Sequence, residues 1–199
     1  MHTFATSARL TLAMCLLLCL GYAGILWGFG KMAGSNHGLP AVTRLNGQNV
    51  GTAAVGQSFT RDTYFWGRPS CAGKGYDATA SDASQMAPSN PLYLQTVKRR
   101  VAAFLKSHPY LKIEEVPAEM VTASGSGLDP DISPTSAKVQ VRRVAQARHL
   151  PARKVRQLVD HCTERPLWGL LGPARVNVLQ LNIALDQMQA KGGKRDFPQ

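Results

Sequence analysis

The hydrophobic pattern begins with one long apolar run near the N-terminus. Residues 10–30, LTLAMCLLLCLGYAGILWGFG, contain no charged side chain and lie between Arg9 and Lys31. A helix of this length is about 30 Å long, which matches the hydrocarbon thickness of a bilayer. Tyr22 and Trp27 lie toward the end of the run, where amphipathic aromatic side chains favour the membrane interface. The pattern predicts a transmembrane helix.

A cleaved signal peptide is the competing interpretation of this run. The apolar part of a signal peptide is usually shorter, about 7–15 residues, and no clear small-residue cleavage site follows here. The few flanking charges do not fix the orientation. We expect a tail of residues 1–9, a membrane helix over 10–30, a Gly- and Ser-containing linker over 31–40 and one domain over 41–199, a length that suits a single domain.

Helical spacing dominates the pattern within the predicted domain. Asn90 and Pro91 form a cap-and-proline start, which predicts a helix over residues 92–107. A second such pair predicts a helix over residues 134–149, and a proline starts a further helix over 151–163. Apolar residues at helical spacing are expected to face the core, namely Leu94, Val97, Val101, Phe104, Leu105, Val155, Leu158 and Val159.

Shorter apolar segments predict the strands. Residues 53–59, AAVGQSF, favour a strand, and the aromatic run in 62–70 favours a short strand ended by a turn, before a long loop over 71–91. Residues 175–189 begin with strand-like alternation and are expected to become helical near Asn182. Leu185 and Met188 are expected to face the core and residues 190–199 to fray. The pattern predicts a mixed α/β domain with more helix than strand.

Two stretches approach catalytic motifs without matching them. GRPSCAGKG has five residues between Gly67 and Gly73 where a phosphate-binding loop has four, and Gly75 stands where that loop needs a hydroxyl. A nucleophile elbow needs a glycine two residues before its serine, and Thr122 and Ser124 stand there before Ser124 and Ser126. A serine–histidine site stays an open alternative, with scattered histidines at His108, His149 and His161.

Metal ligands and disulfides receive little support from the sequence. Asp129 and Asp131 begin like a calcium loop, but a proline separates them and the later glutamate is missing. His161 is adjacent to Cys162, a spacing that does not let the two converge on one ion. Cys71 and Cys162 could pair in an oxidising compartment or remain free, and both alternatives stay open.

Basic residues give the chain a net charge of +11. Residues 138–156 contain seven Lys or Arg and no acid. A solvated helix face is the simplest interpretation, followed by an acidic partner surface or anionic lipid headgroups. The predicted membrane anchor argues against a nucleic-acid partner.

The stretch TASGSGLDPDIS, residues 122–133, predicts a shaped connection rather than an active-site loop. Gly125 and Gly127 are expected to supply backbone angles that other residues rarely adopt. The serines can bond nearby backbone groups in turns, and the Asp-Pro step redirects the chain toward the next helix.

Several motifs in one order carry a family resemblance: VGQSF (55–59), YFWGRPS (64–70), SNP (89–91), VTASGSGLDPDISP (121–134), RVAQAR (143–148) and RVNVLQLNIALD (175–186). Together with one preceding membrane segment, they make the chain resemble the KdpC family of the bacterial Kdp potassium-transporting P-type ATPase. The resemblance covers nearly the whole length.

The resemblance implies a non-catalytic subunit of an inner-membrane complex, with its N-terminus in the cytoplasm and its domain in the periplasm. It implies three partners: a potassium-selecting channel-like subunit, an ATP-hydrolysing P-type subunit and a small membrane subunit. The implied roles are assembly and stabilisation of the complex, together with a chaperone-like increase in the ATP affinity of the pump subunit. No cofactor of its own is implied, and the D-K-T-G-T phosphorylation motif is absent from the sequence.

Gln140 is the residue that the resemblance nominates for the nucleotide effect. Gln140 and Arg143 match the family pattern, whereas Arg142 stands where relatives often have proline. The run after Asp77 also departs from the family's Ser-Gly-Gly-Ser-Asn-like sequence. If the domain is periplasmic, cytoplasmic ATP does not reach Gln140, so any effect is expected to be indirect. The alternative is a membrane-anchored binding module or hydrolase with an unrecognised site.

Overall fold

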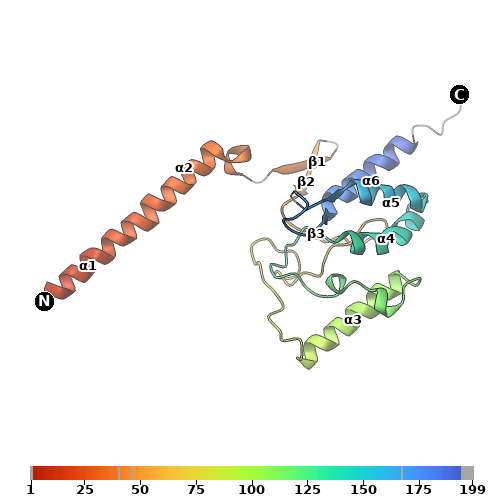
Figure 1. Cartoon of the computed structure of the whole chain (residues 1–199), viewed down its shortest axis with the longest axis horizontal. Helices are drawn as coiled ribbons and strands as arrows, with labels where there is room; N and C mark the ends of the chain where they lie inside the picture. The colour runs from red at the N-terminus through yellow and green to blue at the C-terminus, as the bar shows by residue number, and fades with distance from the viewer. Residues whose placement is uncertain (1, 40, 46, 167, 194–199) are drawn as a thin grey trace. The chain divides into compact units, whose positions relative to one another are not determined.

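The computed structural model describes residues 2–39, 41–45, 47–166 and 168–193 (Figure 1). The chain divides into two units, Met1–Val42 and Thr43–Gln199. The last helix continues to Gly193, so the fraying expected over residues 190–199 is not seen before that point. The remainder of that prediction lies outside the described residues.

One apolar helix forms most of the first unit. It comprises α1 (His2–Cys15), a π-helical stretch (Leu16–Tyr22) and α2 (Ala23–Ala33). Thr3–Ala33, 31 residues, is long and apolar enough to cross a membrane, and none of its side chains is buried within the chain. The helix extends beyond both predicted ends, and residues 31–33, expected in the linker, are helical. A 3₁₀ turn over Ser35–Gly38 follows.

A two-stranded sheet begins at Val42, the last residue of the first unit, and is formed by β1 (Val42–Leu45) and β2 (Gln48–Thr52). Gly47, between the strands, has a φ of 79°, which suits a tight turn. The strand predicted over residues 53–59 is wrong, because β2 ends at Thr52 and turns follow. The Asn-Gly dipeptide before β2 is the signal that would have located the hairpin.

The predicted helix starts are confirmed. α3 spans Pro91–Ser107, and the Asn90 side chain accepts a hydrogen bond from the Leu92 backbone N–H. α4 spans Pro134–Ala147, and Ser133 caps it in the same way. α5 spans Ala152–His161. Two short 3₁₀ turns, Ile113–Glu115 and Ala118–Met120, connect α3 to the stretch before α4.

Three short strands form a second sheet in the order β3-β5-β4. They are β3 (Asp131–Ile132), β4 (Thr163–Glu164) and β5 (Arg175–Asn177), and both pairings are antiparallel. Ile132 and Thr163 both pair with Val176 of the central strand. Helix α6 (Val178–Gly193) follows β5 directly, so the change to helix comes before Asn182, where it was predicted.

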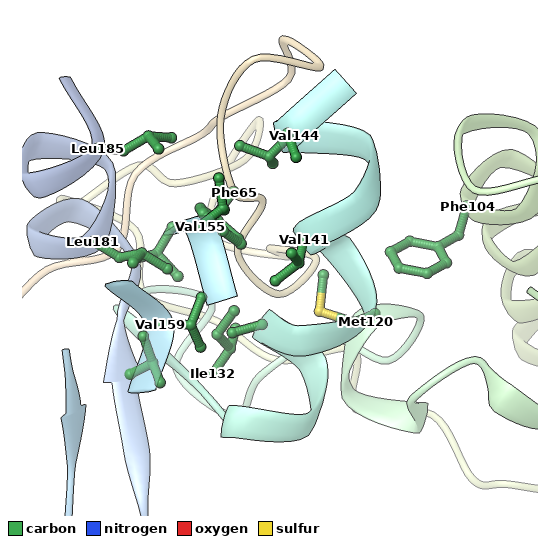
Figure 2. Close-up of a cluster of buried hydrophobic side chains, with 14 residues drawn as sticks. Phe65, Phe104, Met120, Ile132, Val141, Val144, Val155, Val159, Leu181 and Leu185 are labelled. Atoms are coloured by element: carbon green, nitrogen blue, oxygen red, sulfur yellow. The ribbon is translucent and has the colours of Figure 1, made fainter. Parts of the chain in front are cut away.

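The core lies among α4, α5, α6 and the second sheet. Leu181, Leu185 and Val159 are fully buried there, and Met188 and Leu158 pack against the cluster, as their spacing predicted. Figure 2 shows Phe104 at the edge of this cluster, reaching from α3. Of the five residues of α3 that were expected to face the core, Phe104 is buried and Val97, Val101 and Leu105 are half-buried. The prediction is wrong for Leu94, which is 45% exposed.

Candidate functional site

Residues 62–66 form an irregular segment whose backbone is held by side chains instead of by a neighbouring strand. The strand predicted within residues 62–70 is therefore wrong. Each carbonyl oxygen from Asp62 to Trp66 accepts a hydrogen bond from a side chain of α4 or α6, or from the residue that ends α4. We call this arrangement the strapped segment. Its four donors are Gln140, Arg143, Arg148 and Asn182.

Gln140 binds the strapped segment through both ends of its amide. Its Oε1 accepts from the Trp66 backbone N–H at 2.8 Å, and its Nε2 donates to the Trp66 carbonyl at 3.2 Å. Oε1 also accepts from Arg143 Nη2 at 2.8 Å, and Nε2 also donates to the Ser136 carbonyl at 3.1 Å. Gln140 is fully buried. The side chain nominated for the nucleotide effect therefore has all four hydrogen-bonding positions of its amide occupied within the domain.

Arg143 is a buried cation at the centre of the site. The residue is 5% exposed, and Nη1 donates to the carbonyl oxygens of Asp62 at 2.6 Å and Tyr64 at 3.0 Å. The guanidinium lies 4.0 Å from the ring centroid of Trp66. Burial lowers the Arg143 pKa to about 10, so the group stays protonated at neutral pH. Its charge is compensated by backbone dipoles, by the aromatic face of Trp66 and by the Asp62 carboxylate, whose Oδ1 lies 3.7 Å from Nη1.

His108 receives the remaining donor of Arg143. Arg143 Nε donates to His108 Nε2 at 3.0 Å, and His108 Nδ1 donates to the Phe104 carbonyl at 2.8 Å. These partners assign a neutral ring protonated at Nδ1. Burial is the main cause that lowers the His108 pKa to about 4, and the nearby Arg143 charge lowers it further. The ring stacks on Phe104 with centroids 4.0 Å apart.

Two side chains complete the straps from farther along the chain. Arg148 Nε donates to the Thr63 carbonyl at 2.6 Å, and its Nη1 pairs with Asp186 of α6 at 2.6 Å. Asn182 bonds the backbone of Phe65 on both sides, with Oδ1 accepting from N–H at 2.8 Å and Nδ2 donating to the carbonyl at 3.0 Å. These long-range side-chain hydrogen bonds therefore connect α4 and α6 to the same irregular segment.

The basic stretch over residues 138–156 is only partly a solvated face. Arg143 and Arg148 are buried in the site, so that interpretation is wrong for these two residues. Lys138 pairs with Asp160 of α5 at 2.9 Å, and Arg142 lies 4.9 Å from the Tyr110 ring centroid. Sequence reasoning missed that these charges serve internal contacts. The aromatic run upstream of a helix with Gln and Arg on one face was the available signal.

The connector over residues 122–133 is confirmed as a shaped connection. Its backbone bonds two distant loops: the Ser124 N–H donates to the Pro69 carbonyl at 3.3 Å, and the Asp82 N–H donates to the Ser126 carbonyl at 3.1 Å. Gly127 has a φ of 69°, and a Cβ there would lie 2.6 Å from the Ala72 nitrogen. The expectation for Gly125 is wrong, because it has no positive φ and open space around it.

The catalytic and metal candidates do not assemble into a site. Both ring nitrogens of His108 are already bonded, and Ser126 Oγ accepts from the Leu128 N–H at 3.1 Å. His149 and His161 are exposed. Across residues 2–39, 41–45, 47–166 and 168–193, no three His, Cys, Asp or Glu side chains are grouped to hold a metal ion. Cys71 and Cys162 are half-buried, free thiols.

A groove of about 760 Å³ lies beside the strapped segment, between α3 and residues 58–69. We call it the α3 groove. Trp66, which Gln140 and Arg143 fix, forms part of its wall together with Phe104. Gln140 is not among the side chains that line it. The buried contacts of Gln140 and Arg143 with Trp66 therefore shape one wall of the α3 groove.

Comparison with known proteins identifies a family whose sequences match this chain. Residues 4–187 match the family described as KdpC: K+-transporting ATPase, c chain. The potassium-transporting ATPase KdpC subunit of Bacteroides fragilis strain YCH46 is 54% identical over 189 residues, which cover 95% of this chain and 99% of that protein. The subunit of the same name from Phocaeicola vulgatus is 55% identical over 187 residues, covering 94% and 99%. That of Acidobacterium capsulatum is 42% identical over 188 residues, covering 94% and 100%.

Proposed function

This chain belongs to the KdpC family of the potassium-transporting ATPase, and from that premise we propose that it is a non-catalytic subunit that assembles and stabilises the pump. Its proposed partners are the potassium-selecting channel-like subunit, the ATP-hydrolysing P-type subunit and a small membrane subunit. The apolar helix Thr3–Ala33 suggests anchoring in the membrane that holds this complex.

One observation carries the non-catalytic role. Gln140 and Arg143, two polar side chains that match the family pattern, bind backbone groups in the domain interior instead of facing an open cavity. Such buried and fully bonded networks hold a single arrangement of the chain. The serine–histidine alternative gains no support, because His108 has no free ring nitrogen.

Any effect on ATP affinity is proposed to be indirect. A nucleotide could bind the Gln140 amide only after its bonds to Trp66, Ser136 and Arg143 were broken. Loss of such buried bonds costs about 1–3 kcal/mol for each group left without a partner. We therefore propose that Gln140 is a positioning residue, which sets the shape of the surface offered to partner subunits.

The proposed placement is an inner-membrane protein with its N-terminus in the cytoplasm and its domain in the periplasm. A helix of 31 residues, about 46 Å long, supports a span with room for tilt. In this placement the domain and ATP lie on opposite sides of the membrane, which is consistent with an indirect effect.

Deletion of the chain tests the proposed function. Membranes from a strain that expresses the other subunits alone are expected to lose potassium-stimulated ATPase activity, and a tagged pump subunit is expected to purify without its channel-like partner. Supplying the full chain from a plasmid should restore both readouts. Full activity in an assembled complex without this chain would disprove the proposed role.

A further inference from the structure

Helix α3 is only partly covered by its own domain. It has 17 residues, but only Phe104 is buried, and Leu92 and Leu94 near its start are 66% and 45% exposed. A helix of this length is marginal in water unless it packs an apolar face against other elements. α3 therefore presents apolar surface that its own domain leaves uncovered.

The α3 groove opens along one face of this helix. Its helical wall contains a stripe at spacing i, i+3, i+4 and i+7, made of Arg100, Ala103, Phe104 and Ser107, and Lys106 of the same helix also lines the groove. Trp66 lines the groove from the facing segment, with its ring edge-on to Phe104 at a centroid distance of 6.4 Å. The volume, about 760 Å³, is within the range of sites that enclose a ligand or a short chain segment.

The charges along the groove are mostly positive. Arg68, Arg100 and Lys106 line it, against the single carboxylate of Asp62. Lys106 is exposed, and Arg100 makes a 3.3 Å contact with the Val121 carbonyl. Arg68 Nη1 pairs with Asp129, while its buried Nε has no partner among the residues that the structure describes. The groove thus offers cations to an acidic occupant.

We propose that the α3 groove receives an acidic segment of a partner pump subunit, which places an apolar side chain against Phe104 and Trp66 and carboxylates near Arg100 and Lys106. This inference rests on the proposed assembly function. A peptide suits the groove better than a lipid headgroup, because the apolar wall of Phe104 and Trp66 can pack an apolar side chain, which a headgroup lacks, and Ser58 and Thr60 supply hydroxyls for a backbone.

Site-specific photo-cross-linking in the assembled complex tests the occupant. A benzophenone amino acid replaces Ala103, which lines the groove, or Ala102, its exposed neighbour on the same helix that does not line it. We expect the variant at position 103 to cross-link to an acidic segment of one partner subunit, mapped by mass spectrometry, at least about fivefold more than the variant at 102. Equal yields, a product with lipid or a site without acidic residues would overturn the proposal.

Charge reversal supplies a second test with a matched control. Arg100→Glu with Lys106→Glu reverses the groove, and Lys98→Glu with Arg99→Glu makes the same change in charge on exposed positions of α3. We expect the groove pair to lower recovery of partner subunits with the tagged full chain about tenfold, because like charges oppose each other across the interface. The control pair should leave recovery near the wild-type level. Equal losses would overturn the proposal.

The two proposals fail in different ways. If the chain with Arg100→Glu and Lys106→Glu assembles normally while deletion of the chain still prevents assembly of the complex, the groove assignment is wrong and the assembly role stands. If the pump assembles without the chain at all, the assembly role itself is wrong. Reversal of the mapped acids on the partner to lysine should restore recovery with the Arg100→Glu, Lys106→Glu chain.

Discussion

Gln140 is a residue where a structural role and a nucleotide role predict different outcomes. Gln140→Leu keeps the side chain's size but leaves the Trp66 N–H and an Arg143 donor without their acceptor. We expect a loss of about 3 kcal/mol in the free energy of unfolding and less assembled pump. The KM for ATP of the complex that remains should be unchanged.

Thermal unfolding and steady-state ATPase kinetics of the purified complex measure these effects. Gln146→Leu, an exposed change on the same helix, is the control and should behave as wild type. A raised KM for ATP with unaltered stability would contradict the positioning role and favour direct contact with the nucleotide.

His108 makes the domain sensitive to mild acid. Its pKa is about 4 in the folded protein, chiefly because of burial, against about 6.5 in an unfolded chain. Between these values the unfolded state binds a proton that the folded state does not, so stability falls as pH decreases through this window. The loss from pH 7 to pH 5 should be about 2 kcal/mol.

Urea unfolding of the full chain in detergent at pH 7 and pH 5 measures this loss. His108→Gln should be less stable at pH 7 but should show a smaller difference between the two pH values. His161→Gln, at an exposed position, should retain the wild-type difference. An unchanged pH difference in His108→Gln would show that another group is responsible.

At the scale of the elements, the two glycines of the connector over residues 122–133 should respond differently to substitution. Gly127→Val places a branched side chain at a φ of 69° and against the backbone of Ala72 and Asp82, whereas Gly125→Val meets open space. We expect the first change to destabilise the domain by more than about 3 kcal/mol and the second by less than about 1 kcal/mol. Thermal unfolding of the full chain in detergent would measure both changes, and equal effects would contradict the assigned geometry.

The elements that the sequence predicted well are those with local causes. The starts of α3 and α4 depend on a cap and a proline only one or two residues away, so a short window contains the whole signal. The signal for the N-terminal helix, an uninterrupted apolar run, is equally local, although helical residues extend on both sides of the predicted span.

The strapped segment could not be predicted in the same way. Its aromatic residues favour a strand by propensity, but side chains 74 to 117 residues away take the place of strand partners. Likewise, the apolar stripe of α3 has helical spacing, but spacing does not reveal whether the domain itself covers it. The family resemblance supplied Gln140, whereas its partners came only from the three-dimensional arrangement.

At the scale of the whole molecule, the proposed orientation gives a direct prediction. Alkaline phosphatase fused after Gln199 should be active, because it folds outside the cytoplasm, and green fluorescent protein fused there should be dark. The same reporters fused after Arg9, before the apolar helix, should give the opposite pattern. Fluorescence from green fluorescent protein fused after Gln199 would place the domain in the cytoplasm, where direct contact with ATP would again be possible.

The strapped segment also has a consequence for the order of folding. Phe65 bonds Asn182, which is synthesised 117 residues later, and the core needs Leu181 and Leu185 of the same helix. Because a chain emerges from its N-terminus, the domain cannot close until nearly all of it has been synthesised. A chain that stays open this long can be threaded through a translocation channel in extended form. In the orientation proposed here, folding would then follow export instead of competing with it.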